Sequence, residues 1–220
     1  FVIIREKGKL FKKLFYNLYI MEVTFLGTSS MVPTADRNHS GVYLRYENEN
    51  ILVDCGEGIQ RQFKVAKFNP LKVTKILISH WHGDHVLGLP GIMQTMATGE
   101  YSGTLEIYVP KGTEANVHKM FDFFTMHGRL KYKVIEVSPG TFFENDKFSL
   151  EAFKLEHCNR NLGYVFREKD KRKVDLTYLK KFGLEKNKII GELKKGNDIE
   201  WEGKKIKSKL ATTLIKGRSV

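Results

Sequence analysis

The segment that decides the fold is His80-Trp-His-Gly-Asp-His85, which directly follows the apolar run Lys75-Ile-Leu-Ile-Ser79. It places three imidazoles and one carboxylate within six residues. Imidazole nitrogen and carboxylate oxygen are ligands that zinc and similar divalent metals prefer. A polar loop that faces solvent is the alternative, but such a loop rarely gathers four side chains of this kind. The segment therefore predicts a metal site.

The spacing within this segment predicts how its side chains are arranged. On a helix, His80 and His82 would point about 200° apart, given about 3.6 residues per turn. In an extended segment, residues two apart point to the same side. We therefore expect these two histidines to converge where a strand ends, and the next turn to carry Asp84 and His85 to the other side. One short loop could then serve two neighbouring metals.

HWHGDH resembles the HxHxDH signature of the metallo-β-lactamase-fold hydrolases. From Met21 to about Val220, the order and spacing of further motifs are similar to those of ribonuclease Z, the endonuclease family that trims the 3′ trailer from precursor tRNA. HxHxDH alone identifies the superfamily, whereas its combination with PTxxRN and DCGEGxQRQ is more specific. The flanking motifs are Phe25-Leu-Gly-Thr28, Pro33-Thr-Ala-Asp-Arg-Asn38, Leu52-Val-Asp-Cys-Gly-Glu-Gly58, Gln60-Arg-Gln62, Leu155-Glu-His-Cys158 and Leu162-Gly-Tyr-Val165.

The resemblance implies a mixed fold of the α+β or α/β class: a metallo-β-lactamase-like αββα four-layer sandwich, incomplete in this chain and with an inserted basic arm. Apolar periodicity by itself predicts only a mixture of helices and strands. The expected strands are residues 23–26, 40–45, 50–53, 73–79, 105–109, 132–137 and 148–155, and the expected helices are residues 56–68, 87–97 and 113–127.

The resemblance also implies a ligand set. His80, His82 and His157 would hold one metal, and Asp84 and His85 would belong to the second, so a complete active site would hold two Zn²⁺. Two metals lower the pKa of a water between them and neutralise phosphoryl oxygens. The free carboxylate oxygen of Asp84 could also accept the proton of that water, which is general-base catalysis.

Other polar residues receive different interpretations. Asp54 lies at the end of its strand, before a glycine-rich turn, and we interpret it as a carboxylate that orients a ligand histidine. His39, His118 and His127 are expected to hold no metal. His118 and His127 have no acidic or histidine partner at ligand spacing.

The net charge of +12 is spread unevenly along the chain. Residues 21–169 hold 17 basic and 17 acidic side chains, whereas residues 1–20 carry +4, residues 170–209 carry +6 and the last eleven carry +2. A neutral core with basic appendages is typical of a catalytic domain that binds a polyanion. A solvated lysine-rich surface is the alternative.

The basic segments and the PTxxRN motif suggest where precursor tRNA would bind. Arg37 and Asn38 are candidates for contacts with the end of the acceptor stem, because a guanidinium suits phosphates and base edges. Residues 175–209 resemble the tRNA-binding arm of ribonuclease Z, and a basic cluster gives salt-sensitive affinity that does not depend on sequence. The lysines expected to contact tRNA are Lys180, Lys181, Lys194 and Lys195.

These observations divide the chain into a basic N-terminal extension (1–20), a metal-binding half (21–169), the arm (170–209) and a truncated return strand (210–220). Within 1–20, apolar residues at helical spacing alternate with lysines, which excludes a transmembrane span. We expect this extension to lie outside the functional domain. Cys55 and Cys158 have no CxxC spacing and follow no secretory signal, which favours the cytoplasm.

The C-terminal segment Lys216-Gly-Arg-Ser-Val220 departs from the resemblance. In ribonuclease Z, a metal-bridging Asp and a last histidine ligand follow a similar segment. The chain is therefore interpreted as part of an enzyme, usually homodimeric, and is expected to bind about one metal tightly and to cleave precursor tRNA poorly. Two alternatives remain: another metallo-β-lactamase-fold hydrolase of small esters or thioesters, and a tRNA-binding fragment without activity.

Overall fold

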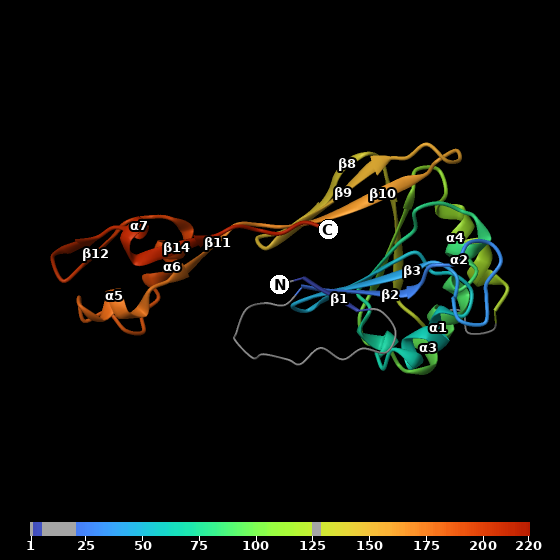
Figure 1. Ribbon diagram of the computed structural model, residues 1–220, viewed down its shortest axis with the longest axis horizontal. Coiled ribbons are helices and arrows are strands. Elements are labelled where there is room, and N and C mark those ends of the chain that lie inside the picture. Colours follow the sequence, from blue (N-terminus) through green and yellow to red (C-terminus); the bar gives the residue numbers. More distant parts are fainter. Residues whose placement is uncertain (1, 6–20, 125–128) are drawn as a thin grey trace. The chain divides into compact units, whose positions relative to one another are not determined.

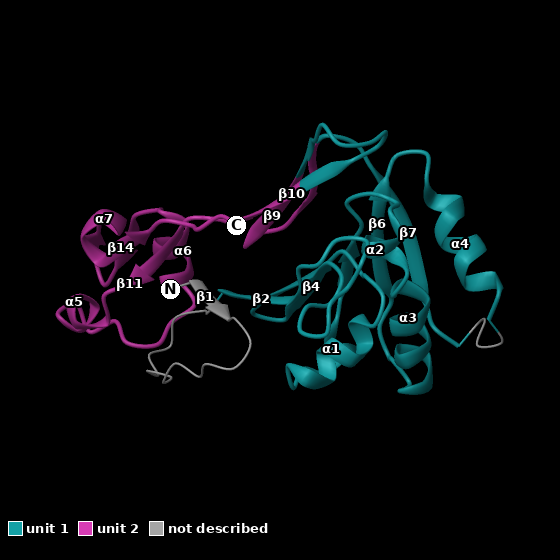
Figure 2. Cartoon of the chain, turned by 45° about the vertical axis from the view of Figure 1, so that its right-hand side comes forward, with its two compact units in different colours: residues 1–139, 152–163 teal, residues 140–151, 164–220 magenta. Residues whose placement is uncertain are grey.

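The computed structural model describes residues 2–5, 21–124 and 129–220. The chain forms two compact units, shown in separate colours in Figure 2. Unit 1 contains Phe1–Pro139 and Ala152–Gly163, and unit 2 contains Gly140–Glu151 and Tyr164–Val220. All of the histidines and acidic residues expected at the metal site therefore belong to unit 1.

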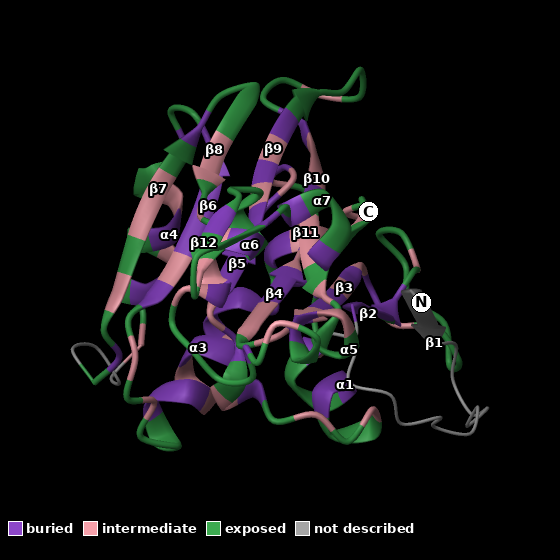
Figure 3. Cartoon of the chain, turned by 90° about the vertical axis from the view of Figure 1, so that its left-hand side faces the viewer, coloured by how far each residue is buried: buried purple, intermediate pink, exposed green. Residues whose placement is uncertain are grey.

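Unit 1 is built on a seven-stranded sheet of order β1-β2-β3-β4-β5-β6-β7, of which β1 to β3 are labelled in Figure 1 and β4 to β7 in Figure 3. The strands β2, β3 and β4 pair antiparallel, and β4, β5, β6 and β7 pair parallel. The strands are β1 (Val2–Arg5), β2 (Met21–Gly27), β3 (Gly41–Tyr46), β4 (Glu49–Val53), β5 (Lys75–Leu77), β6 (Leu105–Pro110) and β7 (Tyr132–Val137).

Helices connect the parallel strands, because a parallel pair needs a crossover. The helix α1 (Ile59–Val65) and the short η1 (Pro70–Lys72) join β4 to β5, α2 (Gly83–Val86) and α3 (Leu89–Thr98) join β5 to β6, and α4 (Glu114–Asp122) joins β6 to β7. Phe63 of α1, Ile92 of α3 and Phe121 of α4 pack in one core with Ile76 and Ile107 of the sheet. Figure 3 shows buried residues running along β5 and β6, as in central strands of a parallel sheet.

This topology positions the metal segment. Because β4, β5 and β6 are parallel neighbours, their carboxyl ends lie at the same edge of the sheet. Asp54 directly follows β4, and His80 follows β5 by three residues. The crevice outside the carboxyl ends of parallel strands is where open α/β sheets bind ligands.

Unit 2 holds most of a three-stranded sheet and all of the arm. The sheet has the order β10-β9-β8, from β8 (Gly140–Glu144), β9 (Phe148–Lys154) and β10 (Leu162–Glu168). The arm starts with β11 (Lys171–Val174), which pairs antiparallel with β14 (Thr212–Ile215) in the segment expected as a return strand. Between them lie α5 (Leu176–Lys180), α6 (Ile190–Lys195), the hairpin β12 (Ile199–Trp201) and β13 (Lys204–Ile206), and α7 (Ser208–Ala211).

The arm has a hydrophobic core of its own. Leu179 of α5, Leu193 of α6 and Ile206 of β13 are fully buried in it. The Asp175 side chain caps the N-terminus of α5 by accepting a hydrogen bond from the backbone N–H of Tyr178 at 3.0 Å. The arm is therefore a folded element and not an extended lysine-rich loop.

Most expected elements are present, with differences at their ends. Helix α3 begins at Leu89 and accepts Pro90 in its first turn, where a backbone N–H has no partner within the helix. The helix expected over 113–127 ends at Asp122. Strand β8 was not predicted, and neither was β1, which pairs parallel with β2.

Two expectations concern residues that the structure does not describe: the helical pattern within 6–20, and His127. In the described part of the chain, no helix is long and apolar enough to cross a membrane.

An ion network around the buried Lys75 joins the amino-terminal ends of β5 and β6 to β4. The Lys75 ammonium is buried and lies 2.8 Å from Glu49 Oε2 and 3.4 Å from Glu106 Oε2. Glu106 also accepts hydrogen bonds from Lys133 at 2.7 Å and from the Tyr108 hydroxyl at 2.8 Å. Burial alone would raise the pKa of Glu106, but these bonds and the Lys75 charge outweigh it, so that its pKa is lowered.

The Glu106→Gln variant is expected to lose about 1–3 kcal/mol of unfolding free energy at pH 7. A carboxylate with a lowered pKa in the folded state stabilises the fold above its unfolded pKa, and this contribution is lost as the pH falls through the folded pKa. The difference between variant and wild type should therefore shrink as the pH falls from 7 through the lowered folded pKa of Glu106. Urea unfolding between pH 3 and 7 measures it, with exposed Glu100→Gln as control. A difference that is constant across pH would contradict the assignment.

Candidate metal centre

His80 and His82 lie in the extended segment that follows β5. The backbone of His82 is extended, with φ −70° and ψ 146°, and it precedes the first turn of α2. Because the segment is extended, the two side chains lie on the same side, and His80 Nε2 is 3.0 Å from His82 Nδ1. His80 is buried, whereas His82 is exposed.

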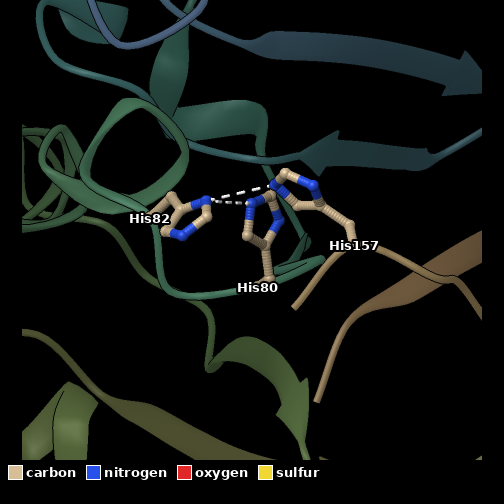
Figure 4. A group of neighbouring side chains, drawn as sticks. All are labelled: His80, His82 and His157. Atoms are coloured by element: carbon tan, nitrogen blue, oxygen red, sulfur yellow. Dashed lines mark hydrogen bonds between the residues drawn. The ribbon is translucent and has the colours of Figure 1, made fainter. Parts of the chain in front are cut away.

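His157 reaches the same place from the loop between β9 and β10. Its Nε2 atom lies 3.3 Å from His82 Nδ1, and Figure 4 shows the three imidazoles facing one another. One ligand nitrogen from each of His80, His82 and His157 can be chosen so that all lie within 4.8 Å of one another. Three imidazoles with an exposed side are the donor set of a metal site that keeps a position open. The residues present therefore fit a metal ion.

The electrostatic surroundings keep His80 in the form that binds metals. Burial, and then the nearby His85, lower the pKa of His80 to about 4, and His82 and His157 act in the same direction, although Asp54 opposes them. A histidine must be neutral to coordinate a metal. The His80 imidazole is thus neutral at pH 7.

The loop that carries His157 is tied to two neighbouring loops of unit 1. The Leu162 backbone N–H donates to the carbonyl of Ser79 at 2.9 Å, next to His80. Arg160 adopts a left-handed φ of 61° and its guanidinium donates to the Gly112 carbonyl, just after β6, at 2.6 Å. These contacts bring His157 to a cluster 75 residues away in the sequence.

Asp84 and His85 form a pair beside the three histidines. Both lie on α2, and His85 Nε2 is 3.4 Å from Asp84 Oδ2. The His85 ring centre is 4.1 Å from that of His80. The structure therefore brings the five expected ligands together as a cluster of three and an adjacent pair.

Asp54 contacts one of these ligands, His85, directly. Its side chain is buried, its backbone has a left-handed φ of 59°, and its Oδ2 atom lies 2.6 Å from His85 Nδ1. The Oδ1 atom accepts the backbone N–H of Ser79 at 2.8 Å. Sequence analysis did not single out Ser79, whose hydroxyl lies 2.9 Å from Asp54 Oδ2 and 2.9 Å from His80 Nδ1. Its position directly before the motif, at a strand end, was the available signal.

Two glycines allow the Asp54 loop to pack against the metal segment. The Cys55 N–H donates to the His85 carbonyl at 2.7 Å, and the Gly88 N–H donates to the Cys55 carbonyl at 2.9 Å. A Cβ atom at Gly56 would lie 2.4 Å from the Asp84 carbonyl oxygen, and one at Gly88 would lie 2.0 Å from the Gly56 oxygen. Only glycine permits backbones to approach this closely.

The two candidates in the PTxxRN motif lie in different surroundings. The Asn38 amide donates to the Glu57 carbonyl at 2.8 Å, and its Oδ1 accepts from Gln62 at 3.4 Å, so its side chain fastens the loop to the start of α1. Arg37 instead lines a hollow of about 700 Å³. The other lining residues are Thr28, Ser29, Ser30, Val32, Thr34 and Asp36.

The remaining expected residues lie outside the cluster. His39 is buried and contacts the Met31 carbonyl at 3.1 Å. His118 contacts the Tyr132 hydroxyl at 3.2 Å and also lies 3.5 Å from Glu114 Oε1, one helical turn earlier, so the expectation that it has no acidic partner was wrong. In unit 2, the four lysines expected to contact tRNA are all exposed, and Lys195 pairs with Glu192 at 2.7 Å. These lysines are Lys180, Lys181, Lys194 and Lys195.

Solved structures of known proteins share the fold of this chain. The human tRNase Z short form (ELAC1) matches with a TM-score of 0.59 and 32% identity, covering 66% of this chain and 64% of that one. The metallo-β-lactamase fold protein YhfI from Bacillus subtilis matches with a TM-score of 0.54 and 23% identity, over 67% and 57%. The fold and the histidine cluster define a metallo-β-lactamase-fold protein, as the sequence predicted.

The chain belongs to the family described as "Anti-Pycsar protein Apyc1", whose family model matches residues 21–178. It is also homologous to ribonuclease Z, which confirms the predicted resemblance. Ribonuclease Z from Thermococcus kodakarensis is 41% identical over 189 residues, which cover 86% of this chain and 60% of the relative. The chain thus spans about 60% of the length of the curated relatives that it matches.

Removing one imidazole from the cluster is expected to weaken metal binding at least about a hundredfold, because only two of its ligands would remain. His82→Ala and His157→Ala each test this, with competition between the protein and a chromophoric chelator for Zn²⁺ or Co²⁺ at pH 7.5. His118→Ala, on α4, serves as the control and should bind like the wild type. An equal loss in the control would show that the metal binds to surface histidines in general.

Proposed function

We propose that this chain supplies the metal site and the RNA-binding arm of an endoribonuclease that removes the 3′ trailer from precursor tRNA and leaves a 3′-hydroxyl. The observation that carries the proposal is the convergence of His80, His82 and His157 in a fold shared with ribonuclease Z relatives. The residues of one metal position and the neighbouring pair of Asp84 and His85 are all present in unit 1.

In this proposal, His80, His82 and His157 would hold one Zn²⁺, and Asp84 and His85 would contribute to a second. When bound, the metals would provide a water of lowered pKa and neutralise charge on the scissile phosphate. The buried Asp84 carboxylate would accept the proton of the attacking water. Asp54, at 2.6 Å from Nδ1 of His85, would keep that ring in a fixed orientation.

The charge of the arm favours a long polyanionic substrate over a small molecule. Residues 170–209 hold 13 basic and seven acidic side chains, and α5 and α6 present exposed lysines on a folded scaffold. A small ester or thioester would gain nothing from such a surface, which disfavours the alternative hydrolase. Contacts with phosphates give affinity that falls steeply with salt. We therefore propose that the arm binds the tRNA body by shape and charge.

Within unit 1, Arg37 is the proposed contact for the end of the acceptor stem, because it lines a hollow rich in hydroxyl side chains and a guanidinium suits phosphates. For Asn38 we propose an indirect role, because its side-chain amide is hydrogen-bonded to Glu57 and Gln62 and so fixes the shape of the loop that carries Arg37.

By the resemblance to ribonuclease Z, we further propose that the protein acts as a homodimer. Light scattering of the purified protein tests this proposal.

Replacing residues 175–211 by Asn-Gly is expected to lower precursor tRNA affinity at least tenfold and to flatten its salt dependence. Val174 and Thr212 are paired neighbours at the base of the arm, so a two-residue turn can join them. Hydrolysis of a small phosphodiester should be unchanged relative to the same protein with its arm. Unchanged tRNA affinity at about 0.15 M salt would exclude the arm as the binding surface.

A second variant separates charge from shape. Changing four arm lysines to glutamine should lower the slope of log affinity against log salt by about 3–4, if each contacts one phosphate. Fluorescence anisotropy of labelled precursor tRNA at several salt concentrations measures the slope. The arm variant carries Lys180→Gln, Lys181→Gln, Lys194→Gln and Lys195→Gln, and the control in unit 1 carries Lys64→Gln, Lys72→Gln, Lys111→Gln and Lys119→Gln.

The activity is tested on the chain alone and on a fusion in which the C-terminal part of the Thermococcus kodakarensis relative follows Val220. The fusion is expected to release the trailer in single-turnover assays and leave a tRNA 3′-hydroxyl, whereas the chain alone should release little. Asp84→Ala in the fusion should lower the rate at least about a hundredfold. A fusion that binds two metals and hydrolyses a small phosphodiester, but leaves precursor tRNA intact, would overturn the proposed substrate.

A further inference from the structure

Ser79 uses every polar group it has to join the strand end to the metal segment. Its backbone N–H donates to Asp54 Oδ1 at 2.8 Å, and its carbonyl accepts from the Leu162 N–H at 2.9 Å. Its hydroxyl lies 2.9 Å from Asp54 Oδ2 and 2.9 Å from His80 Nδ1. The hydroxyl therefore lies between the buried Asp54 carboxylate and the His80 ring, which belongs to the histidine cluster.

Proton accounting fixes the direction of these bonds. An ionised carboxylate only accepts hydrogen bonds, and a hydroxyl has a single proton to donate. The Ser79 hydroxyl must therefore donate to Asp54, and its lone pairs must accept from His80. The His80 ring proton then lies on Nδ1, which leaves Nε2 as the acceptor that faces His82 at 3.0 Å.

The same carboxylate acts directly on a second ring. His85 Nδ1 lies 2.6 Å from Asp54 Oδ2, so this ring also carries its proton on Nδ1. Its Nε2 atom then faces Asp84 Oδ2 at 3.4 Å. A tautomer set by the hydrogen bond at the other nitrogen is how proteins select which nitrogen of a histidine binds a metal.

We propose that Ser79 is a positioning residue that connects Asp54 to His80, so that one carboxylate sets the tautomers of His80 and His85. The inference rests on the proposed metal site and deepens it, because His80 belongs to the cluster of three and His85 to the adjacent pair. Asp54 reaches His85 directly and His80 through the Ser79 hydroxyl. The Ser79 hydroxyl lies 2.9 Å from His80 Nδ1 but 3.5 Å from His85 Nδ1, whose direct partner is Asp54 at 2.6 Å. Loss of the hydroxyl should therefore change the His80 tautomer and leave that of His85 in place, whereas loss of the Asp54 charge affects both rings.

The backbone supports this assignment. Asp54 is held at φ 59°, a left-handed conformation that is uncommon for a non-glycine residue. Its loop is fixed there by the Cys55 N–H bond to the His85 carbonyl at 2.7 Å. The carboxylate is thus held between the two rings by the fold, and the short side chain of Ser79 spans the remaining distance to His80.

The test reads the tautomers in the metal-free protein without RNA. Two-bond ¹H–¹⁵N spectra of the full chain with ¹⁵N-labelled histidine, at about pH 8.5, distinguish a proton on Nδ1 from one on Nε2. In the wild type, His80 and His85 should both carry it on Nδ1. In Ser79→Ala, His80 should shift towards the Nε2-protonated form while His85 stays unchanged, and Ser79→Thr, which keeps a hydroxyl, should restore the wild-type spectrum.

Metal binding provides the second readout. Ser79→Ala should weaken Zn²⁺ binding about 10–100-fold in a chelator competition, whereas Ser79→Thr should stay within about threefold of the wild type. A wild-type His80 ring protonated on Nε2 would overturn the proposal, even if the alanine variant failed to fold. A folded Ser79→Ala protein with an unchanged His80 tautomer would also overturn it. Both readouts, the histidine tautomers and the Zn²⁺ affinity, are measured without RNA. They therefore test the role of Ser79 even if the proposed nuclease activity is wrong.

Discussion

The metal centre depends on the direct packing of two backbone segments, residues 54–58 and residues 84–88. Their contact leaves no space for a side chain at Gly56 or Gly88, and its hydrogen bonds hold Cys55 between His85 and Gly88. It brings the end of β4 beneath the turn that follows β5. This packing places the Asp54 carboxylate next to His85 and the Ser79 hydroxyl. The orientation of the ligand histidines depends on that position.

The central part of the fold and site could be predicted from the sequence because its signals are local. The apolar run before His80 indicates a buried strand, and the alternation of His80 and His82 indicates an extended segment, so strand and ligands follow from neighbouring residues. His157 is different, since nothing near it in the sequence has ligand spacing. Only the resemblance to a known family predicted its role, because its place depends on contacts of the loop with Ser79 and Gly112.

Other features could not be predicted because they depend on tertiary contacts. Ser79 has the sequence context of any strand end, and its importance appears only when Asp54 and His80 lie on either side of its hydroxyl. Asn38 belongs to a motif that suggests substrate contact, yet its amide bonds within the protein. The arm looks like a charged surface segment in the sequence, because its buried residues are widely spaced among lysines.

The separate core of the arm has a consequence for how the chain loses its structure. The residues that stabilise the arm do not belong to the core beneath the seven-stranded sheet. Each set of contacts can therefore open without breaking the other, and a single melting temperature would not describe the whole chain. Hydrogen exchange should reveal two groups of amides with different opening free energies. A protease that cuts within an open arm would then leave the histidine cluster intact.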